Sequence, residues 1–298
     1  MVSKIKTFLR IVATVKNWPA VLVAYFLPKK EFSGVFRNGN KIRIFSGGWK
    51  DFMNYVNFFR IFPLGEIKSG KAKIKYRLND LTFNFGKMGP CVLNEVFGKE
   101  IYKESLNYFN IKNKIVIDIG ASLGDTAIYF LLNGSKKVYA FEPLPSVYEL
   151  AEENIKFNNF QDKCQVINAA VGWGSGAYIK DPKFEYIFER DLKEYKKNNQ
   201  IPIITLQDIV DKFGLKNAVL KIDCEGREYD IILNSSNALL RKFDYIIIEY
   251  HYGFKNIEEK LKEAGFSIKS GKSVKLYAND RQEGRKQMLI GYLFAVKI

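Results

Sequence analysis

Hydrophobic and polar positions change their pattern about a third of the way along the chain. Before residue 110, alternating runs flank Asn38-Gly39 and Asn79-Asp80, and each of these turn signals predicts a β-hairpin. A helical stretch over residues 92–109 leads out of this region. From residue 114 onward, apolar runs alternate with amphipathic stretches, which is typical of parallel strands joined by helices.

This second pattern assigns the segments of the C-terminal part. Strands are expected at residues 115–119, 137–141, 165–169, 218–223 and 244–250. Helices are expected at residues 124–132, 145–157, 205–213, 227–234 and 255–265, the last with Asn256 as its N-cap. Three further strands, at residues 266–270, 274–277 and 288–296, have no helices between them, so we expect an antiparallel pair at the C-terminus.

Composition divides the chain in the same place. A hydrophobic share of 47% with 15% aromatic residues excludes a disordered chain. Residues 1–110 contain 19 Lys and Arg against 7 Asp and Glu, a net charge of +12, whereas residues 111–298 carry only +3. We therefore predict a basic N-terminal region over residues 1–110 and a core domain over residues 111–298. The basic region is expected to contact phosphate, in RNA, a nucleotide sugar or a membrane surface, or to be only a solvated lysine-rich surface.

Three cysteines, Cys91, Cys164 and Cys224, bear on the compartment. They form no C-x-x-C pair and any pairing leaves one thiol over, which argues against a disulfide framework and a zinc site. We therefore expect reduced thiols and a cytoplasmic protein. The apolar run at residues 21–27 is too short to span a membrane, and no signal-peptide cleavage site follows it. The N-terminal segment is expected to pack on the domain as a helix or to make a peripheral membrane contact.

A glycine-containing turn follows the first strand of the core. The sequence DIGASLGD, which begins at Asp118, predicts a strand that turns at Gly120 and enters a helix after Gly124. Glu142, 24 positions after Asp118, ends the second strand, where nucleoside-binding sheets carry an acid for ribose hydroxyls. The turn lacks the middle glycine of a dinucleotide motif, and Asp125 would repel a pyrophosphate. It instead favours a cationic nucleoside without phosphate, such as S-adenosylmethionine.

Polar residues also follow the expected third strand. Asn168 ends that strand at the same edge of the sheet, and it is expected either to meet the adenine edge of the cofactor or only to terminate the strand. An insertion between Gly172 and Leu206 contains short runs at residues 177–180 and 184–188 that predict a hairpin. We expect this hairpin to lean over the site and shape the acceptor pocket.

The fourth and fifth strands end in charged residues. The run KIDCEGRE, which begins at Lys221, gathers charges around one glycine, and burying them is costly unless the site uses them. His251, the only histidine of the chain, follows the fifth strand. Unless it is structural, an imidazole with a near-neutral pKa is expected there to take the proton of a hydroxyl, oriented by Asp223 or Glu225.

Together these motifs resemble the FkbM family of S-adenosylmethionine-dependent methyltransferases over roughly residues 110–255, most specifically in the Lys-Ile-Asp-x-Glu-Gly block at Lys221. The resemblance implies a class I (Rossmann-like) methyltransferase sheet. With the patterns above, the expected fold class is α/β, with an antiparallel C-terminal strand pair and a smaller basic N-terminal α+β region. The resemblance also implies methyl transfer to a hydroxyl of a sugar, glycolipid or related metabolite. Ser122 and Gln207 depart from the asparagine and aspartate common in the family, and neither removes a group that the chemistry needs.

The resemblance implies roles for particular residues. It implies that Asp118, Gly120 and Glu142 bind the cofactor. The position of His251 after the fifth strand, and not the resemblance, is the reason to expect it to act as base with Asp223 and Glu225. The expected cofactor site as a whole comprises Asp118, Gly120, Ala121, Ser122, Gly124, Asp125, Thr126, Glu142, Pro143, Asn168, Ala169 and Asp223.

Other functions stay open on the sequence alone. Aromatic residues and lysines are interleaved over residues 50–77, as in nucleic-acid-binding surfaces, so an RNA methyltransferase is the main alternative. The Asp/Asn-Pro-Pro-Tyr motif of enzymes that alkylate base nitrogens does not follow the fourth strand, which favours hydroxyl chemistry. A non-catalytic glycan- or membrane-binding scaffold with a degenerate cofactor fold is a further alternative, and a dehydrogenase is disfavoured by the glycine spacing.

A metal is a separate question. Asp223, Glu225, Glu249 and His251 could cluster at adjacent strand ends and hold Mg²⁺ through oxygen ligands. Pairing of the carboxylates with Lys221 and Arg227 is the simpler explanation, so a Mg²⁺ requirement is not favoured.

Overall fold

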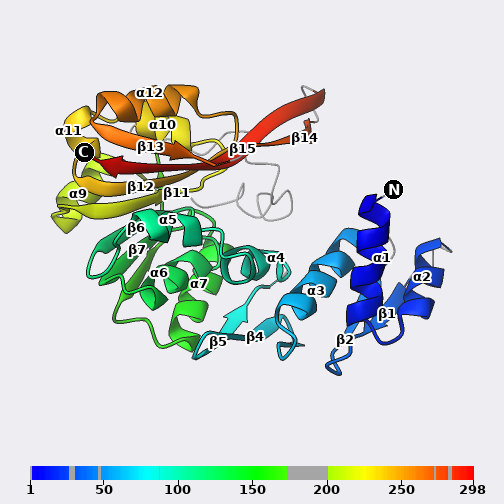
Figure 1. Cartoon of the computed structure of the whole chain (residues 1–298). Helices are drawn as coiled ribbons and strands as arrows, with labels where there is room; N and C mark the ends of the chain where they lie inside the picture. The colour runs from blue at the N-terminus through cyan, green and yellow to red at the C-terminus, as the bar shows by residue number, and fades with distance from the viewer. Residues whose placement is uncertain are drawn as a thin grey trace. The chain divides into compact units, whose positions relative to one another are not determined.

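A computed structural model of the chain describes residues 2–26, 31–45, 48–86, 88–172, 201–271, 273–280 and 284–298. It divides into two compact units (Figure 1). The first is Met1–Lys103 with Lys156–Asn158, and the second is Glu104–Ile155 with Asn159–Ile298. The roles expected of a region over residues 1–110 and a domain over residues 111–298 remain predictions.

The N-terminal unit combines helices with two small antiparallel sheets. Its helices are α1 (Val2–Thr14), α2 (Trp18–Phe26), α3 (Trp49–Ile61) and α4 (Cys91–Leu93), which continues into a π-helical turn at Asn94–Gly98. Its strands are β1 (Glu31–Val35) and β2 (Lys41–Phe45) in one sheet and β3 (Glu66–Lys68), β4 (Lys71–Tyr76) and β5 (Asn79–Asn84) in the other. The hairpin predicted around Asn38-Gly39 is the β1–β2 pair.

The second predicted hairpin turns two residues earlier than expected. Tyr76 pairs with Asn79, so the turn is formed by Arg77 and Leu78 and not by Asn79-Asp80. Arg77 adopts a left-handed φ of 55°. Its guanidinium lies 4.9 Å from the Tyr76 ring centroid and pairs with Glu100 at 3.3 Å. These contacts hold a turn that carries no glycine, and the local turn signal could not reveal them.

The helix predicted over residues 92–109 is broken in two. Residues between Gly98 and α5 (Lys103–Tyr108) leave the helical path, and Glu100 adopts a φ of 47°. The Glu100 carboxylate accepts a hydrogen bond from the Tyr76 hydroxyl at 2.7 Å and pairs with Lys103 at 2.7 Å. A Cβ at Gly98 would lie 2.7 Å from Ile61, so the backbone passes close to α3 there. Tertiary contacts therefore override the helical pattern.

The second unit contains a mixed sheet in the order β13-β15-β12-β11-β6-β7-β8. The parallel strands β6 (Ile115–Ile119), β7 (Lys137–Phe141), β8 (Cys164–Ile167), β11 (Ala218–Ile222) and β12 (Phe243–Tyr250) match the predicted segments within two residues. Strand β15 (Gly284–Lys297) runs antiparallel to β12, to β13 (Phe266–Ser270) and to β14 (Val274–Asp280). The predicted α/β fold class with an antiparallel C-terminal pair is confirmed.

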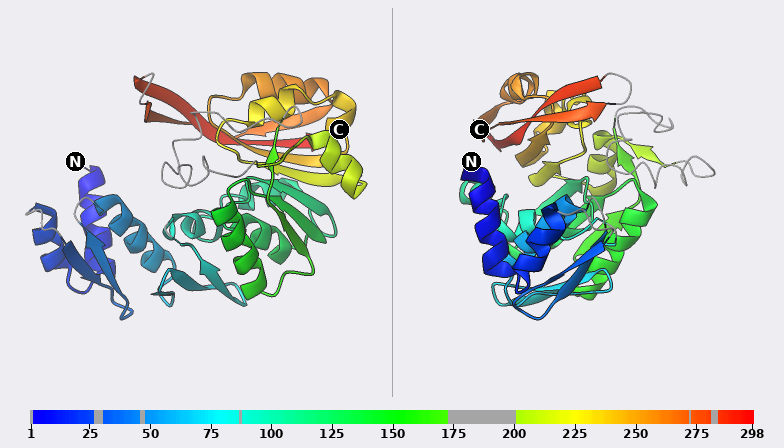
Figure 2. Two further views of the ribbon diagram at one scale, coloured as in Figure 1. Left: turned by 180° about the vertical axis from the view of Figure 1, so that it is seen from behind. Right: turned by 90° about the vertical axis from the view of Figure 1, so that its right-hand side faces the viewer.

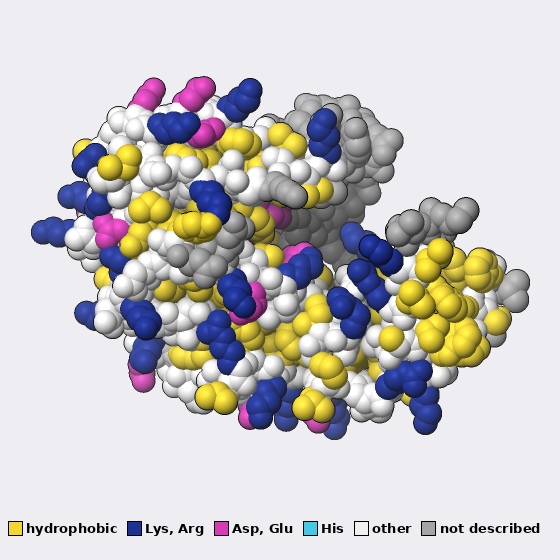
Figure 3. Space-filling view, in the orientation of Figure 1, with side chains coloured by type: hydrophobic (Ala, Val, Ile, Leu, Met, Phe, Trp, Pro, Cys, Tyr) yellow, Lys and Arg dark blue, Asp and Glu magenta, His cyan; other side chains and the backbone are white. Residues whose placement is uncertain are grey.

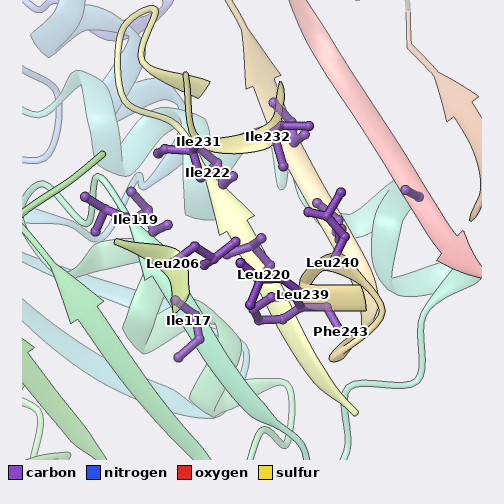
Figure 4. Close-up of a cluster of buried hydrophobic side chains, with 14 of the residues drawn as sticks. Ile117, Ile119, Leu206, Leu220, Ile222, Ile231, Ile232, Leu239, Leu240 and Phe243 are labelled. Atoms are coloured by element: carbon purple, nitrogen blue, oxygen red, sulfur yellow. The ribbon is translucent and has the colours of Figure 1, made fainter. Parts of the chain in front are cut away.

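Helices cover both faces of this sheet. Two of them, α6 (Asp125–Leu132) and α7 (Pro145–Phe157), lie on one face (Figures 1 and 2). The other face carries α9 (Leu206–Phe213), α10 (Glu228–Leu233), α11 (Asn237–Leu240) and α12 (Lys255–Glu263). A cluster of buried aliphatic side chains joins them to the sheet, with Ile117, Leu220, Leu206, Ile231 and Leu240 among its members (Figure 4). Because side chains alternate along a strand, Asp118 and Lys221 point to the opposite face.

Local signals set some helix boundaries and not others. Helix α9 begins with a capping box in which Thr205 and Asp208 satisfy each other's backbone N–H groups, and it ends at a left-handed Gly214. Helix α12 has Phe254 as its N-cap, so the assignment of Asn256 was wrong; the Asn256 amide oxygen accepts from the Ile257 N–H inside the first turn.

Among the described residues, no helix has the length and apolar character needed to cross a bilayer.

The predicted insertion starts and ends on a short parallel pair. Strand β9 (Ala170–Val171) pairs with β10 (Ile203–Ile204). The hairpin expected from residues 177–180 and 184–188 lies outside the described residues.

Candidate active site

The site lies at the point where the strand order of the sheet reverses. Strand β6 pairs with β7 on one side and with β11 on the other, and the carboxyl ends of all three meet at one edge. In open α/β sheets this switch point is where ligands bind. The residues expected to act lie at or just beyond these strand ends.

The turn after β6 requires its glycines. Gly120 adopts a φ of +75°, and a Cβ there would lie 1.7 Å from the carbonyl oxygen of Asp223, so only glycine fits. The N–H groups of Gly120 and Ala121 both donate to the Phe141 carbonyl at 3.0 Å. Gly124, with a φ of +73°, is the N-cap of α6 and provides no side-chain cap. The turn therefore lies tightly between β7 and β11.

Glu142 links this turn to the end of β7. Its Oε2 accepts from the Ser122 N–H at 3.0 Å, and its Oε1 accepts from the Leu144 N–H at 3.0 Å. Burial raises the pKa of Glu142 to about 7, although the two N–H groups and Lys221 act to lower it. Each carboxylate oxygen keeps a further lone pair, so the group can still accept hydroxyl donors such as those of a ribose.

Asn168 shapes the neighbouring loop. Its amide donates to the carbonyl oxygens of Glu142 at 2.9 Å and Pro143 at 3.0 Å, while Ala169 is buried. These bonds hold the strand ends of β7 and β8 together. The contact expected between Asn168 and an adenine edge remains a prediction.

Asp118 is fully buried and paired within the protein. Its Oδ1 lies 2.9 Å from Lys221 Nζ, and its Oδ2 accepts from the Thr126 hydroxyl. Lys221 Nζ also donates to the Gly120 carbonyl at 2.8 Å. Asp118 and Thr126 thus support the turn from beneath, and the cofactor role expected of them would be exerted through the shape of the turn.

Asp125 differs from the other acids of the turn. Its side chain is buried at the start of α6, and its Oδ1 has no hydrogen-bond partner among the described residues. Burial raises the pKa of Asp125 to about 7, while its own backbone N–H and Lys221 act to lower it. A buried acceptor without a partner is expensive, which fits a site made for a donor that arrives with a ligand.

His251 sits between two carboxylates. Its Nδ1 lies 3.0 Å from Glu228 Oε1 and its Nε2 lies 3.2 Å from Glu225 Oε2. The His251 backbone N–H also donates to Glu228 Oε1 at 3.0 Å, and the Gly226 N–H donates to Glu228 Oε2 at 2.8 Å. Glu225 was expected to orient the imidazole, and the structure brings the two together. The buried Glu228 was missed as a partner, although it stands in the charged run, three positions after Glu225 at the start of α10.

These carboxylates decide the charge of the imidazole. Burial acts to lower the His251 pKa, but the hydrogen bonds and charges of Glu225 and Glu228 outweigh it and raise the pKa to about 11. The side chain is only 3% exposed. The expectation of a near-neutral imidazole was therefore wrong, because the sequence could not show that two carboxylates enclose the ring. At neutral pH His251 is a cation.

Asp223 and Glu249 also lie close to His251. One ligand atom from each of these three residues falls within 4.8 Å of the other two. Burial and the charge of Asp223 raise the pKa of Glu249 to about 8, and Glu249 Oε2 accepts from the Tyr292 hydroxyl at 2.5 Å.

The two cations expected to pair with these carboxylates have other partners. Lys221 lies 2.9 Å from Asp118, and Arg227 pairs with Asp230 at 2.9 Å. A Mg²⁺ requirement remains a prediction that is not favoured.

Parts of the chain are similar in sequence to known methyltransferases. A ribosomal protein L11 methyltransferase from Carboxydothermus hydrogenoformans is 38% identical over 125 residues, which are 41% of this chain and 39% of that protein. The hexuronic acid methyltransferase AglP of Haloferax volcanii is 24% identical over 163 residues, 52% of this chain and 64% of that protein. The chain thus spans less than two thirds of the length of these curated relatives.

A solved structure and a family profile complete the comparison. A SAM-dependent methyltransferase from Agrobacterium tumefaciens is 13% identical and has a TM-score of 0.45, covering 77% of this chain and 70% of that one. The profile described as "Methyltransferase FkbM domain" matches residues 118–268, about half of the chain. The match includes the glycine turn, Glu142, the charged run and His251. As its motifs predicted, the chain belongs to the FkbM family of methyltransferase domains.

Proposed function

We propose that this protein is an S-adenosylmethionine-dependent methyltransferase. The observation that carries the proposal is the turn at Gly120 at the switch point of the sheet, where Glu142 bonds to Ser122 within the turn and Asp125 begins the helix after it. Glu142 would accept the ribose hydroxyls, and Asp125, whose Oδ1 has no described partner, would accept the ammonium group. The bound cofactor would supply a sulfonium methyl group that a nucleophile can attack.

The charges of the turn support this ligand over a dinucleotide. Asp125 and Glu142 both keep acceptor capacity, whereas a pyrophosphate needs donors at the start of the helix. Burial raises the pKa of both side chains to about 7, so a cationic ligand would favour their ionised forms when it binds. A nucleoside with a positive charge and no phosphate therefore fits this end of the sheet.

The cluster at the ends of β11 and β12 supports transfer to a hydroxyl. A hydroxyl that attacks a methyl group must lose its proton, and Glu249, with a pKa of about 8, would in its ionised form be a stronger base than an ordinary carboxylate. His251 would act as a positioning residue, since its imidazolium is already protonated and lies between Glu225 and Glu228. This replaces the expected role of His251 as base.

We propose a sugar, glycolipid or related metabolite as the acceptor. The likeness to a hexuronic acid methyltransferase supports this class, and so does a site that offers carboxylates for hydroxyl protons. An RNA acceptor is the second candidate. It is favoured by the net charge of +12 in residues 1–110 and by a 25% identity over 169 residues to an uncharacterized RNA methyltransferase from Fusobacterium nucleatum.

The first experiment is calorimetric titration of the full chain with S-adenosylmethionine and S-adenosylhomocysteine. Wild type should bind both at micromolar concentration, and Glu142→Ala should bind neither, because it loses the acceptor that bridges the turn. Glu259→Ala, at an exposed position on α12, is the matched control and should bind as wild type does. Absence of binding by folded wild-type protein would leave the non-catalytic scaffold as the better reading.

The second experiment separates the two acceptor classes. Uronic acids, glycolipids and RNA are offered with a labelled methyl donor to wild type and to Glu249→Gln. Label in the carbohydrate that the variant reduces by about a hundredfold would support the proposal, because general base catalysis contributes on this order. Label in RNA alone would move the assignment to the second candidate.

A further inference from the structure

The first two helices expose an apolar surface. Helix α2 is a run of nine residues, WPAVLVAYF, without a charged side chain. It buries Val21 and Ala24 but leaves Val23, Tyr25 and Phe26 open to solvent, with Phe26 74% exposed. A helix that is apolar all round is normally buried on all sides, so the exposure of these three side chains is unusual.

Helix α1 adds to the same surface. It turns Ile11 toward the interior of the unit and leaves Ile5, Phe8 and Leu9 exposed. The ring of Phe8 contacts Trp18, the first residue of α2, with a centroid distance of 5.8 Å. Figure 3 shows hydrophobic side chains gathered over the part of the unit that α1 and α2 form, with Lys and Arg beside them. We call this the α1–α2 surface, defined by Ile5, Phe8, Leu9, Val23, Tyr25 and Phe26.

This surface is held in place by the sheet beneath it. The Asn17 amide, between the two helices, donates to the Ser33 carbonyl at 2.9 Å and accepts from the Val35 N–H at 2.7 Å. The Lys16 N–H donates to the Val35 carbonyl at 2.7 Å. The Tyr25 ring lies 4.5 Å from that of Trp49. The apolar side chains are therefore presented on a fixed scaffold, which reduces the entropy lost on docking.

The charged side chains of the two helices and of the link between them have one sign. Lys4, Lys6, Arg10 and Lys16 lie in residues 2–26, and the first acidic residue of the chain is Glu31. The side chains of Lys6, Arg10 and Lys16 are exposed. Basic residues beside exposed aliphatic and aromatic groups complement a surface that is anionic at its boundary and apolar beneath, which describes the headgroup and acyl region of an acidic bilayer.

We propose that the α1–α2 surface docks on an anionic lipid bilayer. Each helix is too short to cross the hydrocarbon core, so both lie in the interface with Phe26, Leu9 and their neighbours inserted among the acyl chains. Trp18 and Tyr25 belong to the residue types enriched at that depth. The inference stands apart from the methyl transfer itself, since it uses none of the residues at the sheet edge.

The test is sedimentation of the full chain with vesicles of phosphatidylcholine alone and of phosphatidylcholine containing phosphatidylglycerol. Wild type should bind the anionic vesicles, and binding should weaken in high salt because the charge attraction is screened. Val23→Ser/Phe26→Ser should reduce binding at least about tenfold, since two inserted apolar side chains are lost. The matched control, Leu64→Ser/Leu78→Ser, changes side chains that are 85% and 95% exposed elsewhere in the unit and should bind as wild type does.

A charge pair of variants tests the second half of the proposal. Lys6→Glu/Arg10→Glu should also lose binding, while Lys73→Glu/Lys75→Glu, at exposed positions on β4, should reduce it far less. Equal loss in both would mean that only net charge matters and would overturn the assignment to this surface. So would failure of wild type to bind either vesicle. A dimer in sedimentation velocity that Val23→Ser/Phe26→Ser dissolves would assign the surface to a second copy of the chain instead.

Discussion

The Nζ of Lys221 lies 2.9 Å from Oδ1 of Asp118, and both side chains are buried. The two residues are register partners on the adjacent parallel strands β11 and β6, so they point to the same face of the sheet. Burial acts to lower the pKa of Lys221, but Asp118 and Asp223 outweigh it and raise that pKa. Because Lys221 Nζ also donates to the Gly120 carbonyl, the ion pair holds the turn that forms the cofactor end of the site.

Breaking this pair from one side should be severe. Lys221→Met leaves the Asp118 carboxylate buried without its cation, and such losses cost about 3–5 kcal/mol in unfolding free energy. The double variant Asp118→Asn/Lys221→Met removes both charges and should recover much of that loss. Urea unfolding of the two single variants and the double variant measures the coupling. Additive effects of the two single changes would show that the residues do not interact as the structure has them.

His251 should remain protonated across the physiological range. It is the only histidine of the chain, so its ring signals in an NMR titration need no assignment. With Glu225 and Glu228 raising its pKa to about 11, the ring should show no titration between pH 5 and pH 9. Because the pKa of His251 is higher in the folded than in the unfolded protein, its contacts with Glu225 and Glu228 contribute their full stabilisation below about pH 6.5. That stabilisation should decline as the pH rises toward 11.

A matched pair of variants separates the effect of direct carboxylate contact on the His251 pKa from the effect of nearby negative charge. Glu228→Gln removes a buried partner of the ring and should lower the His251 pKa. Asp230→Asn changes a neighbouring acid that pairs with Arg227 and does not contact the ring, so the titration should stay as in wild type. A wild-type midpoint near 6.5 would contradict the arrangement and restore His251 as a candidate base.

Glu142 should make stability depend on pH with a defined sign. Its pKa is about 7 in the folded protein against 4.5 for an ordinary glutamate, so the folded state keeps a proton that the unfolded state loses. Its contribution to the unfolding free energy therefore falls as the pH rises from about 4.5 to 7, by about 3 kcal/mol in total. The side chain of Glu142→Gln cannot ionise. Relative to wild type, the unfolding free energy of this variant should therefore rise by about that amount between pH 4.5 and pH 8.

Denaturant unfolding at a series of pH values measures this difference directly. Glu259→Gln, at an exposed position on α12, is the control and should follow the wild-type pH dependence. If Glu142→Gln also follows wild type, the carboxylate is not buried as the structure has it. A result of that kind would weaken its assignment as the ribose acceptor.

How far the sequence could predict this site depends on how far apart the interacting residues lie in the chain. The turn at Gly120 and the place of Glu142 at the end of β7 were predictable because turn chemistry and strand spacing are local patterns. The charge of His251 was not, because Glu228 reaches it across 23 positions through the pairing of β11 with β12. The position of the turn at Arg77 was predicted wrongly for the same reason, since Glu100 stabilises that turn from another segment of the chain.

Gly120 and Gly214, both in the second unit, have positive φ but different surroundings. Gly214, at the end of α9, has a φ of +57° and nothing within 4 Å of an added Cβ, so Gly214→Ala should cost only about 1 kcal/mol, from backbone strain. A Cβ at Gly120 would instead lie 1.7 Å from the Asp223 carbonyl oxygen, closer than atoms can approach. Gly120→Ala must therefore separate β6 from β11 as well as bear the strain.

The structure consequently predicts unequal costs for the same chemical change. Gly120→Ala should lower the unfolding free energy by more than about 4 kcal/mol, a size reserved for strain or steric conflict in a packed region. Urea midpoints of the two variants give the comparison, and titration with S-adenosylhomocysteine under folding conditions shows whether binding is lost with it. Equal midpoints would mean that the strand ends do not approach so closely. In that case the tight turn could not be what presents Glu142 and Asp125 to a ligand.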